Sequence, residues 1–230
     1  MIPKIIHQTW KRDSIPKQWI PFTEKVKSLN PGWEYMLWTD RDNDDFVRRN
    51  YPGFYGIFTG FSRNIMRADV IRYLIMDKIG GVYLDLDYEV LKPFDFQEHR
   101  VVLPKNRSMQ SGDEKDELGN CIFASVPGHV FWSDVINELA AHPPVINNYL
   151  DVHEATGPLF LTRMYNTHPY PDIYTPDREL YHPESPKRKK DIPALKASNT
   201  SYGIHHPWGS WKERFTITHL KRKIRQITGS

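Results

Sequence analysis

Two aspartates in the segment GGVYLDLDYEV, residues 80–90, have the residue type and the spacing of a metal site. Asp85 and Asp87 are separated by one leucine and follow a short apolar run that we expect to be a buried strand. Side chains at positions i and i+2 of an extended segment point to the same face, so both carboxylates could address one hard cation. Mg²⁺ or Mn²⁺ accepts such oxygen ligands and keeps positions for water and for a diphosphate.

The elements around this pair alternate between strand and helix. The sequence predicts strands at residues 4–10, 34–38 and 82–84, with helices in the segments 16–29, 40–49 and 63–79 between them. A further strand and helix are expected at residues 121–126 and 128–139, after a polar loop at residues 107–118. Such alternation predicts an α/β fold with a mostly parallel central sheet. Ligands of these sheets bind beyond the carboxyl ends of the strands, where the two aspartates fall.

The helix predicted over residues 63–79 adds a second pair of chemical interest. It contains neither glycine nor proline, and apolar residues recur along one side from Ile65 to Ile79. Asp69 and Arg72 are three residues apart on it and therefore share a face. The carboxylate could accept hydrogen bonds from sugar hydroxyls, and the guanidinium is a permanent cation for phosphate. The alternative is an ordinary ion pair on the helix surface.

Composition limits the other classes of function. The 230 residues favour one domain, and the single cysteine excludes an intramolecular disulfide. No apolar run approaches the ~20 residues of a membrane span and no signal sequence is evident, so we expect a cytoplasmic chain, at most peripheral to a membrane. The net charge is +3, with basic clusters at residues 187–190 and 221–226 that are either solvated surface or a face for anionic lipid or an acidic acceptor. Nucleic-acid motifs are absent, and no nucleic-acid partner is expected.

Three ordered stretches together resemble a known family: IPKIIHQTWK, NPGWEYMLWTD and RADVIRYLIMDKIGGVYLDLD. They resemble glycosyltransferase family 32, which includes inositolphosphorylceramide mannosyltransferases and initiation-specific α-mannosyltransferases, with the large glucosylating toxins as distant relatives. The resemblance covers residues 2–95 and, more loosely, GPLFLT and the segment near Trp211. It implies a GT-A fold, a nucleotide-sugar donor, Mn²⁺ or Mg²⁺, and retention of the anomeric configuration. Residues 1–95 would form the donor-binding half of a single domain over residues 1–230, and residues 96–230 the acceptor side.

The resemblance also implies roles for individual residues of the first half. Asp87 becomes a direct metal ligand, and Asp85 a partner of the donor ribose or of metal-bound water. Trp10 resembles the aromatic residue that stacks on the nucleobase, with Thr9 beside it and Tyr83 also on the donor side. Asp69 and Arg72 match the positions that hold sugar hydroxyls and phosphates, so the catalytic set is expected to be these two residues and the two aspartates of the motif.

Two segments of the second half are assigned in the same way. GIHHPWGSW, residues 203–211, resembles the segment that closes over the donor diphosphate. A neutral histidine, His206 slightly in preference to His205, could complete the metal coordination, and Ser210 and Trp211 could donate to diphosphate oxygens. The alternative for this segment is a loop of packed aromatics and hydrogen-bonded histidines. Thr156 and Gly157 resemble an element near the donor sugar that would shape the acceptor side, or Thr156 is simply a helix N-cap.

The function expected from these residues is metal-dependent transfer of a hexose to a hydroxyl of a glycan or glycolipid. No nucleophile is evident, which favours front-face displacement with the leaving phosphate taking the proton of the acceptor. GDP-mannose is the favoured donor, ahead of UDP-galactose, UDP-glucose and UDP-N-acetylglucosamine. Two rival hypotheses are a non-catalytic module that binds sugar nucleotides or carbohydrate and a metal-dependent phosphohydrolase.

Overall fold

The computed structural model describes residues 1–96, 98–106, 117–148, 151–181, 193, 196 and 200–207. Most of the predicted polar loop at residues 107–118 lies outside the described residues. Both basic clusters, residues 187–190 and 221–226, lie outside them entirely.

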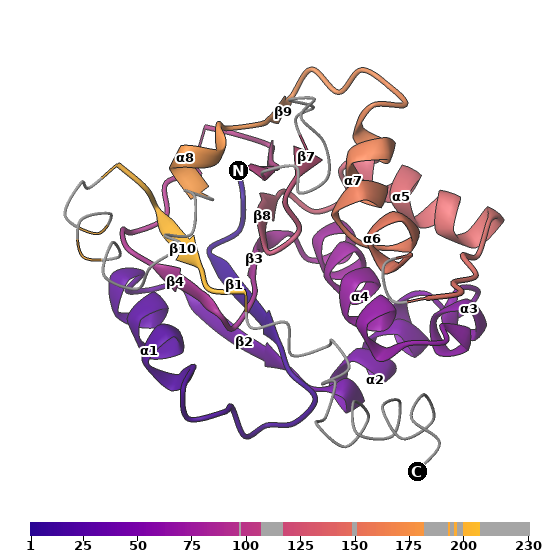
Figure 1. Cartoon of the computed structure of the whole chain (residues 1–230), viewed down its shortest axis with the longest axis horizontal. Coiled ribbons are helices and arrows are strands. Elements are labelled where there is room, and N and C mark those ends of the chain that lie inside the picture. The colour runs from indigo at the N-terminus through magenta and orange to yellow at the C-terminus, as the bar shows by residue number, and fades with distance from the viewer. Residues whose placement is uncertain are drawn as a thin grey trace, which may run out of the picture.

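A central sheet crosses the molecule in the order β2-β1-β3-β8-β5-β9 (Figure 1). Its strands are β1 (Ile5–Thr9), β2 (Glu34–Trp38), β3 (Gly81–Leu84), β5 (Val101–Val102), β8 (Ile122–Ser125) and β9 (Ile173–Tyr174). Strand β1 pairs in parallel with β2 and β3, and β5 pairs in parallel with β9, whereas β8 is antiparallel to both β3 and β5. The expected α/β fold with a mostly parallel sheet is confirmed, and β8 is the strand that runs the other way.

Two short antiparallel ribbons lie outside this sheet. One joins β4 (Tyr88–Val90) to β10 (Gly203–His205), and the other joins β6 (Lys105–Asn106) to β7 (Glu117–Leu118). The β4–β10 ribbon brings residues more than a hundred positions apart side by side, directly after the motif of two aspartates.

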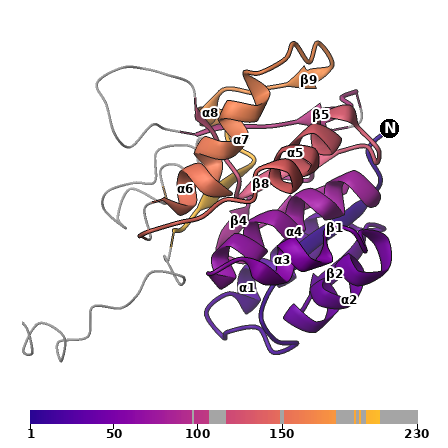
Figure 2. The ribbon, with the colours of Figure 1, turned by 90° about the vertical axis from the view of Figure 1, so that its right-hand side faces the viewer.

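Helices cover both faces of the sheet. They are α1 (Ile20–Leu29), α2 (Asp40–Asn50), α3 (Tyr55–Gly60), α4 (Asn64–Lys78), α5 (Val130–Ala141), α6 (Val152–Ala155), α7 (Pro158–Tyr165) and α8 (Arg178–Tyr181). Figure 2 shows α4, α5 and α7 in one layer in front of the sheet, while α1 lies on the other side (Figure 1). Two buried clusters match this division, one formed with α2 to α5 and α7 and one with α1.

Local sequence explains where α2 and α4 begin and end. Thr39 caps α2 in a capping box, because its hydroxyl accepts the Asp42 N–H and the Asp42 carboxylate accepts the Thr39 N–H. Gly80 ends α4 with a positive φ of 71°. Gly81 follows with φ 94°, and a Cβ there would lie 2.6 Å from the carbonyl oxygen of Ile5, so β3 approaches β1 this closely only without a side chain.

Helix α4 is buried around most of its circumference. Met66 and every residue from Asp69 to Met76 are buried, whereas Ile65 and Ile79 are only partly buried. The apolar side predicted from Ile65 to Ile79 does pack in or against the core, but the buried surface of the helix extends well beyond that side. The reason is that α4 packs between the sheet and the helices α2, α3 and α5, so several faces of the helix meet apolar neighbours.

Within the described part of the chain, none of the helices combines the length and the apolar character that a membrane crossing requires.

Candidate active site

The two aspartates of the motif lie in the turn that joins β3 to β4. The N–H of Tyr88 donates to the carbonyl of Asp85 at 3.1 Å, which closes a four-residue turn, and the N–H of Asp85 donates to the carbonyl of Cys121 at 2.8 Å. Asp85 and Asp87 are therefore not on an extended segment, contrary to the sequence analysis. Their expected position at the carboxyl end of β3 is confirmed, and the turn rather than strand alternation brings the carboxylates together.

A histidine from the β4–β10 ribbon joins the two carboxylates. Asp85, Asp87 and His205 each offer a ligand atom, and these atoms lie within 4.8 Å of one another. Strand β10 pairs with β4 and thereby places Nε2 of His205 3.3 Å from Oδ1 of Asp87. Two carboxylate oxygens and one imidazole nitrogen fit a divalent cation that accepts oxygen ligands and tolerates one nitrogen ligand. Among the described residues this is the one group of three or more such side chains.

The neighbouring histidine, His206, was expected from the sequence to be the ligand, but it has another partner. Nε2 of His206 lies 3.1 Å from Oε2 of Glu89, and its ring stacks on Phe22 of α1 at 5.1 Å between centroids. The backbone N–H of His206 donates to the carbonyl of Asp87. Successive residues at the end of a strand point in opposite directions, so His205 faces the carboxylates when His206 faces Glu89. The structure thus brings His205, and not His206, to the two aspartates.

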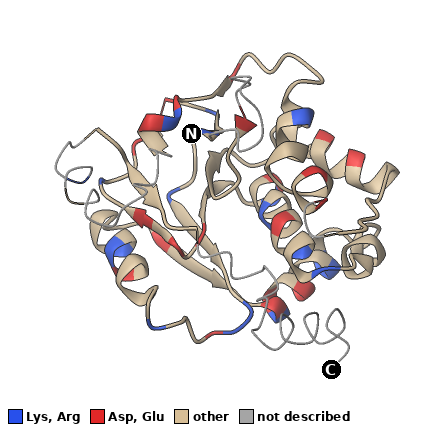
Figure 3. Cartoon of the chain, in the orientation of Figure 1, with Lys and Arg blue, Asp and Glu red and all other residues tan. Residues whose placement is uncertain are grey.

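Glu89 is a buried acid that binds three basic side chains. Besides His206, it accepts hydrogen bonds from Lys25 of α1 at 3.1 Å and from Lys196 at 2.7 Å. Burial alone would raise the pKa of Glu89, but the hydrogen bonds from His206, Lys196 and Lys25 outweigh it and lower the pKa to about 2. Figure 3 shows the acidic segment of β4 beside α1. Glu89 therefore fastens the end of β10, and with it His205, to α1 and β4.

The predicted pair on α4 lies directly beside the aspartates. Nη2 of Arg72 is 3.2 Å from Oδ1 of Asp69, and Nη1 is 3.4 Å from Oδ1 of Asp85. Both side chains of the pair are only 5% exposed, so the alternative of a surface ion pair is wrong. The guanidinium also donates to the carbonyls of Ala68 at 2.9 Å and Asn120 at 2.5 Å. These contacts fix the guanidinium of Arg72 at the edge of the sheet.

The carboxylate of Asp69 is held on both oxygens. Oδ1 accepts from the amide of Asn120 at 3.1 Å, and Oδ2 accepts from the hydroxyl of Thr156 at 3.0 Å. Burial raises the pKa of Asp69 to about 7, and the rise is limited by Arg72 and by the hydrogen bonds from Thr156 and Asn120. Burial also raises the pKa of Asp85, partly offset by the charge of Arg72.

Two side chains predicted on the donor side, Thr9 of β1 and Tyr83 of β3, reach the same site. The hydroxyl of Tyr83 donates to Oδ1 of Asp85 at 2.7 Å and lies 3.1 Å from the hydroxyl of Thr9. The guanidinium carbon of Arg72 lies 4.7 Å from the centre of the Tyr83 ring. Trp10 follows Thr9 at the end of β1 and is partly exposed, with its ring edge-to-face against buried Trp19 at 4.9 Å.

Thr156 lies beneath Asp69 and is fully buried. Its carbonyl accepts the hydroxyl of Tyr73, a residue of α4 one turn beyond Asp69, at 2.7 Å. Gly157, rather than Thr156, is the N-cap of α7, so the reading of Thr156 as a helix N-cap is wrong. The hydroxyl that a cap would use is instead engaged by the carboxylate of Asp69.

Two predicted donors to the diphosphate, Ser210 and Trp211, lie outside the described residues. Two residues of the site were not predicted at all. Asn120 binds both Asp69 and Arg72, and Glu89 orients His206. Glu89 follows Asp87 by two residues, and this spacing could have indicated that Glu89 lies near the site. Asn120 precedes an antiparallel strand, and no local pattern indicates its place in the site.

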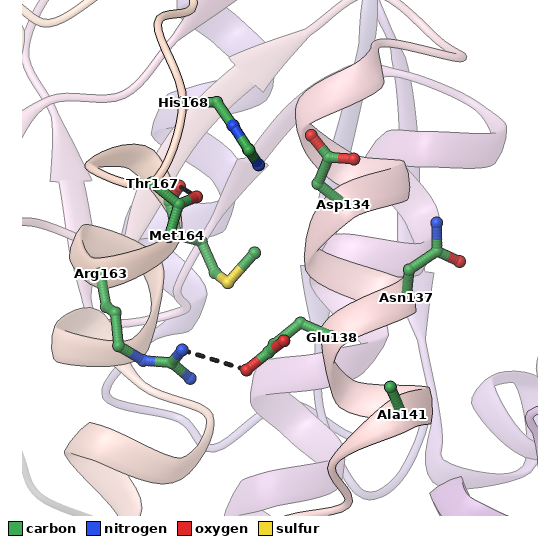
Figure 4. Close-up of a pocket in the computed structure, with 8 residues that line it drawn as sticks. All are labelled: Asp134, Asn137, Glu138, Ala141, Arg163, Met164, Thr167 and His168. Carbon is green, nitrogen blue, oxygen red and sulfur yellow. Dashed lines mark hydrogen bonds and ion pairs between the residues drawn. The ribbon is translucent and has the colours of Figure 1, made fainter.

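A groove of about 310 Å³ lies between α5 and α7, away from these residues (Figure 4). It is lined by Asp134, Asn137, Glu138, Ala141, Arg163, Met164, Thr167 and His168. An ion pair of 3.0 Å between Arg163 and Glu138 spans it. None of the site residues predicted from the sequence lines this groove. The groove therefore gives no support to a donor site between α5 and α7.

Comparison with known proteins finds similar sequences and a similar fold. Residues 16–109 match a family described as "Glycosyltransferase sugar-binding region containing DXD motif". The chain is 37% identical over 186 residues to inositol phosphoceramide mannosyltransferase 3 of Schizosaccharomyces pombe, a match that covers 79% of this chain and 48% of that protein. It is also 37% identical over 164 residues to mannosyl phosphorylinositol ceramide synthase CSH1 of Saccharomyces cerevisiae, covering 70% of this chain and 42% of that protein. The chain thus spans about half the length of these relatives.

A solved structure supports the fold. The PaToxG glycosyltransferase superposes with a TM-score of 0.54 over 71% of this chain and 68% of its own, at 14% identity, which shows the fold alone. The fold is the GT-A type expected from the sequence. The segment that matches this family, residues 16–109, contains the two aspartates of the motif and the pair on α4, so the similarity to a DXD-containing glycosyltransferase sugar-binding region includes four residues of the site.

Proposed function

We propose that the chain contains the catalytic site of a metal-dependent, retaining glycosyltransferase that moves mannose from GDP-mannose to a hydroxyl of a glycan or glycolipid. The observation that supports this most directly is the convergence of Asp85, Asp87 and His205 within 4.8 Å, beside the buried cation of Arg72. A nucleotide sugar has a diphosphate next to the bond that breaks, and this site offers both a cation position and a fixed guanidinium for it.

The residues of the site divide the work of such a transfer. A divalent cation, Mn²⁺ or Mg²⁺, held by Asp85, Asp87 and His205 would supply electrostatic stabilisation of the leaving phosphate. Arg72 adds a second, permanent positive charge beside it, and Asp69 accepts a hydrogen bond from a hydroxyl of the transferred sugar. Trp10 stacks on the base at the end of β1.

The donor sugar would react by front-face displacement. The bond between the anomeric carbon and the phosphate oxygen breaks while the acceptor hydroxyl bonds to the same face, and the proton of that hydroxyl passes to the departing phosphate. Atoms and charge balance without an enzyme nucleophile. Ser210 and Trp211 are proposed as further donors to the diphosphate.

The acceptor is proposed from the names of the similar proteins. The first acceptor to test is inositol phosphoceramide, a glycolipid precursor whose hydroxyl-rich head group is anionic. Contact of the basic clusters at residues 187–190 and 221–226 with anionic lipid would suit this acceptor.

A transfer assay tests the proposal. The protein is incubated with Mn²⁺, GDP-mannose and inositol phosphoceramide in detergent micelles, and the lipid product is identified by mass spectrometry and its anomeric configuration by proton NMR. We expect one added hexose in the α configuration of the donor, and no product with Asp87→Asn. Donor hydrolysis at a rate independent of the acceptor would instead favour a phosphohydrolase. Donor binding without any turnover would favour a binding module.

A further inference from the structure

We propose that Asn120 and Thr156 are positioning residues that set the carboxylate of Asp69 for one hydroxyl of the donor sugar. This inference rests on the proposed function, because it assumes that Asp69 accepts a hydrogen bond from the sugar. Its basis is the set of contacts around the buried carboxylate of Asp69, which the transfer mechanism above does not use.

The hydrogen bonds at Asp69 leave a defined acceptor position. Oδ1 accepts from Asn120 at 3.1 Å and lies 3.2 Å from Nη2 of Arg72, so both of its lone-pair directions are taken. Within the described part of the chain, Oδ2 accepts only the hydroxyl of Thr156, at 3.0 Å, which leaves one lone-pair direction. Removing either donor would free the carboxylate to rotate and would change where that direction points.

The three residues come from three segments that the fold brings together. Asp69 is on α4, Asn120 directly precedes β8, and Thr156 lies between α6 and α7. Thr156 is itself fixed to α4, because its carbonyl accepts the hydroxyl of Tyr73 at 2.7 Å. The side chain of Thr156 is fully buried, so its hydroxyl donates to Asp69 and not to solvent.

The segment at Asn120 also connects Asp69 to the guanidinium of Arg72 and to Asp85. The backbone carbonyl of Asn120 accepts Nη1 of Arg72, and the carbonyl of the next residue, Cys121, accepts the N–H of Asp85 at 2.8 Å. The antiparallel direction of β8 puts its first residues at the same edge as the end of β3, with Ile122 opposite Leu84. One short segment thus fixes Asp69, Arg72 and Asp85 relative to one another.

Two substitutions remove the side-chain hydrogen bonds to Asp69 one at a time. Thr156→Val removes the hydroxyl at nearly constant volume, and Asn120→Ala removes the amide but retains the backbone carbonyl that binds Arg72. Thr156→Ser restores a hydroxyl and serves as the rescue variant. Thr23→Val is the matched control, because Thr23 is a buried threonine of α1 whose hydroxyl donates to Gln8 and does not contact Asp69.

The measurement is the dissociation constant of GDP-mannose and of GDP, each by calorimetry with Mn²⁺, on variants whose thermal unfolding shows a folded protein. We expect Thr156→Val and Asn120→Ala to raise the dissociation constant of GDP-mannose about 10-fold relative to that of GDP. The dissociation constant of GDP itself should change less than about 2-fold. Thr156→Ser and Thr23→Val should keep the ratio of the wild type.

Three results would count against the inference. The first is a wild-type ratio of the two dissociation constants in both Thr156→Val and Asn120→Ala, and the second is an equal loss of affinity for GDP and GDP-mannose. Either would show that the two residues only stabilise the fold, and would overturn the inference while the proposed function stands. If the wild type binds neither ligand, the proposed donor is wrong and the inference fails with it. If Thr156→Val does not fold, Asn120→Ala decides alone, because it removes no backbone contact.

Discussion

Nη1 of Arg72 lies 3.4 Å from Oδ1 of Asp85, although one residue is on α4 and the other follows β3. The other terminal nitrogen of the same guanidinium, Nη2, lies 3.2 Å from Oδ1 of Asp69. Arg72 therefore joins the part of the site that would hold the cation to the part that would hold the sugar. It does so with a planar group whose donors point in several fixed directions, which a lysine ammonium does not provide.

Arg72→Lys should lower the rate of sugar transfer by on the order of 100-fold, even though the positive charge is kept. One ammonium cannot reach Asp69, Asp85 and the carbonyl of Asn120 together, so the charge would no longer be fixed beside the leaving phosphate. The measurement is kcat for transfer from GDP-mannose. Arg48→Lys is the control, because Arg48 forms an exposed ion pair with Asp44 on α2, and it should leave kcat unchanged. Equal rates for wild type and Arg72→Lys would contradict the role given to Arg72.

His205→Ala and His206→Ala should differ in their effect on metal affinity. His205 lies beside both aspartates, so its loss should weaken Mn²⁺ binding at least about 10-fold. His206 contacts Glu89 and Phe22, so its loss should change Mn²⁺ affinity by less than about 2-fold and act mainly on thermal stability. Titration of free Mn²⁺ by electron paramagnetic resonance measures both. The reverse order of the two variants would restore the preference for His206 that the sequence suggested.

His7 should make folding stability depend on pH below neutrality. It is fully buried on β1, accepts the indole N–H of Trp38 on Nδ1 and lies 2.9 Å from the carbonyl of Gly80 through Nε2. Burial lowers its pKa from 6.5 to about 4, so between these values the unfolded chain binds a proton that the folded chain does not. Stability should therefore fall as the pH falls through this window, by about 2 kcal/mol between pH 7.5 and pH 5 from this residue.

Urea unfolding of the wild type and of His7→Gln at the two pH values tests this. Glutamine has no proton to gain, so the pH-dependent loss should be smaller in the variant by about 2 kcal/mol. The difference between the proteins is needed because Asp69, with its raised pKa, titrates in the same range with the opposite sign. Parallel pH profiles for the two proteins would show that His7 is not held neutral by its surroundings.

Much of the fold was predictable because its signals are local. The apolar run before Thr9, the capping box at Thr39 and the glycines after α4 each specify an element from a few adjacent residues. The parallel pairing of β1 with β2 and β3 then follows from the alternation of strand and helix. The direction of β8 does not follow from it, because nothing in residues 119–126 specifies the partner strands.

The site was predictable as far as its residues lie on those local elements. Asp69, Arg72 and the two aspartates of the motif were found from spacing and resemblance, and the structure brings all four together. The contribution of Asn120 depends on the antiparallel strand β8, so it required the tertiary structure. The choice between His205 and His206 depends on which side chain of β10 faces β4, and a one-residue change of register reverses it.

The central claim is that Asp87 and its neighbours bind a nucleotide sugar through a divalent cation, and a donor screen by thermal unfolding tests it most directly. The protein is heated with Mn²⁺ and, in turn, GDP-mannose, UDP-galactose, UDP-glucose and UDP-N-acetylglucosamine, beside Asp87→Ala under the same conditions. A donor present at 100 times its dissociation constant adds about 2.7 kcal/mol of stability, which raises the unfolding temperature by several degrees. We predict such a rise for GDP-mannose with the wild type and Mn²⁺, and none with Asp87→Ala or with EDTA. An equal rise in the variant, or no rise with any of the four donors, would contradict the account.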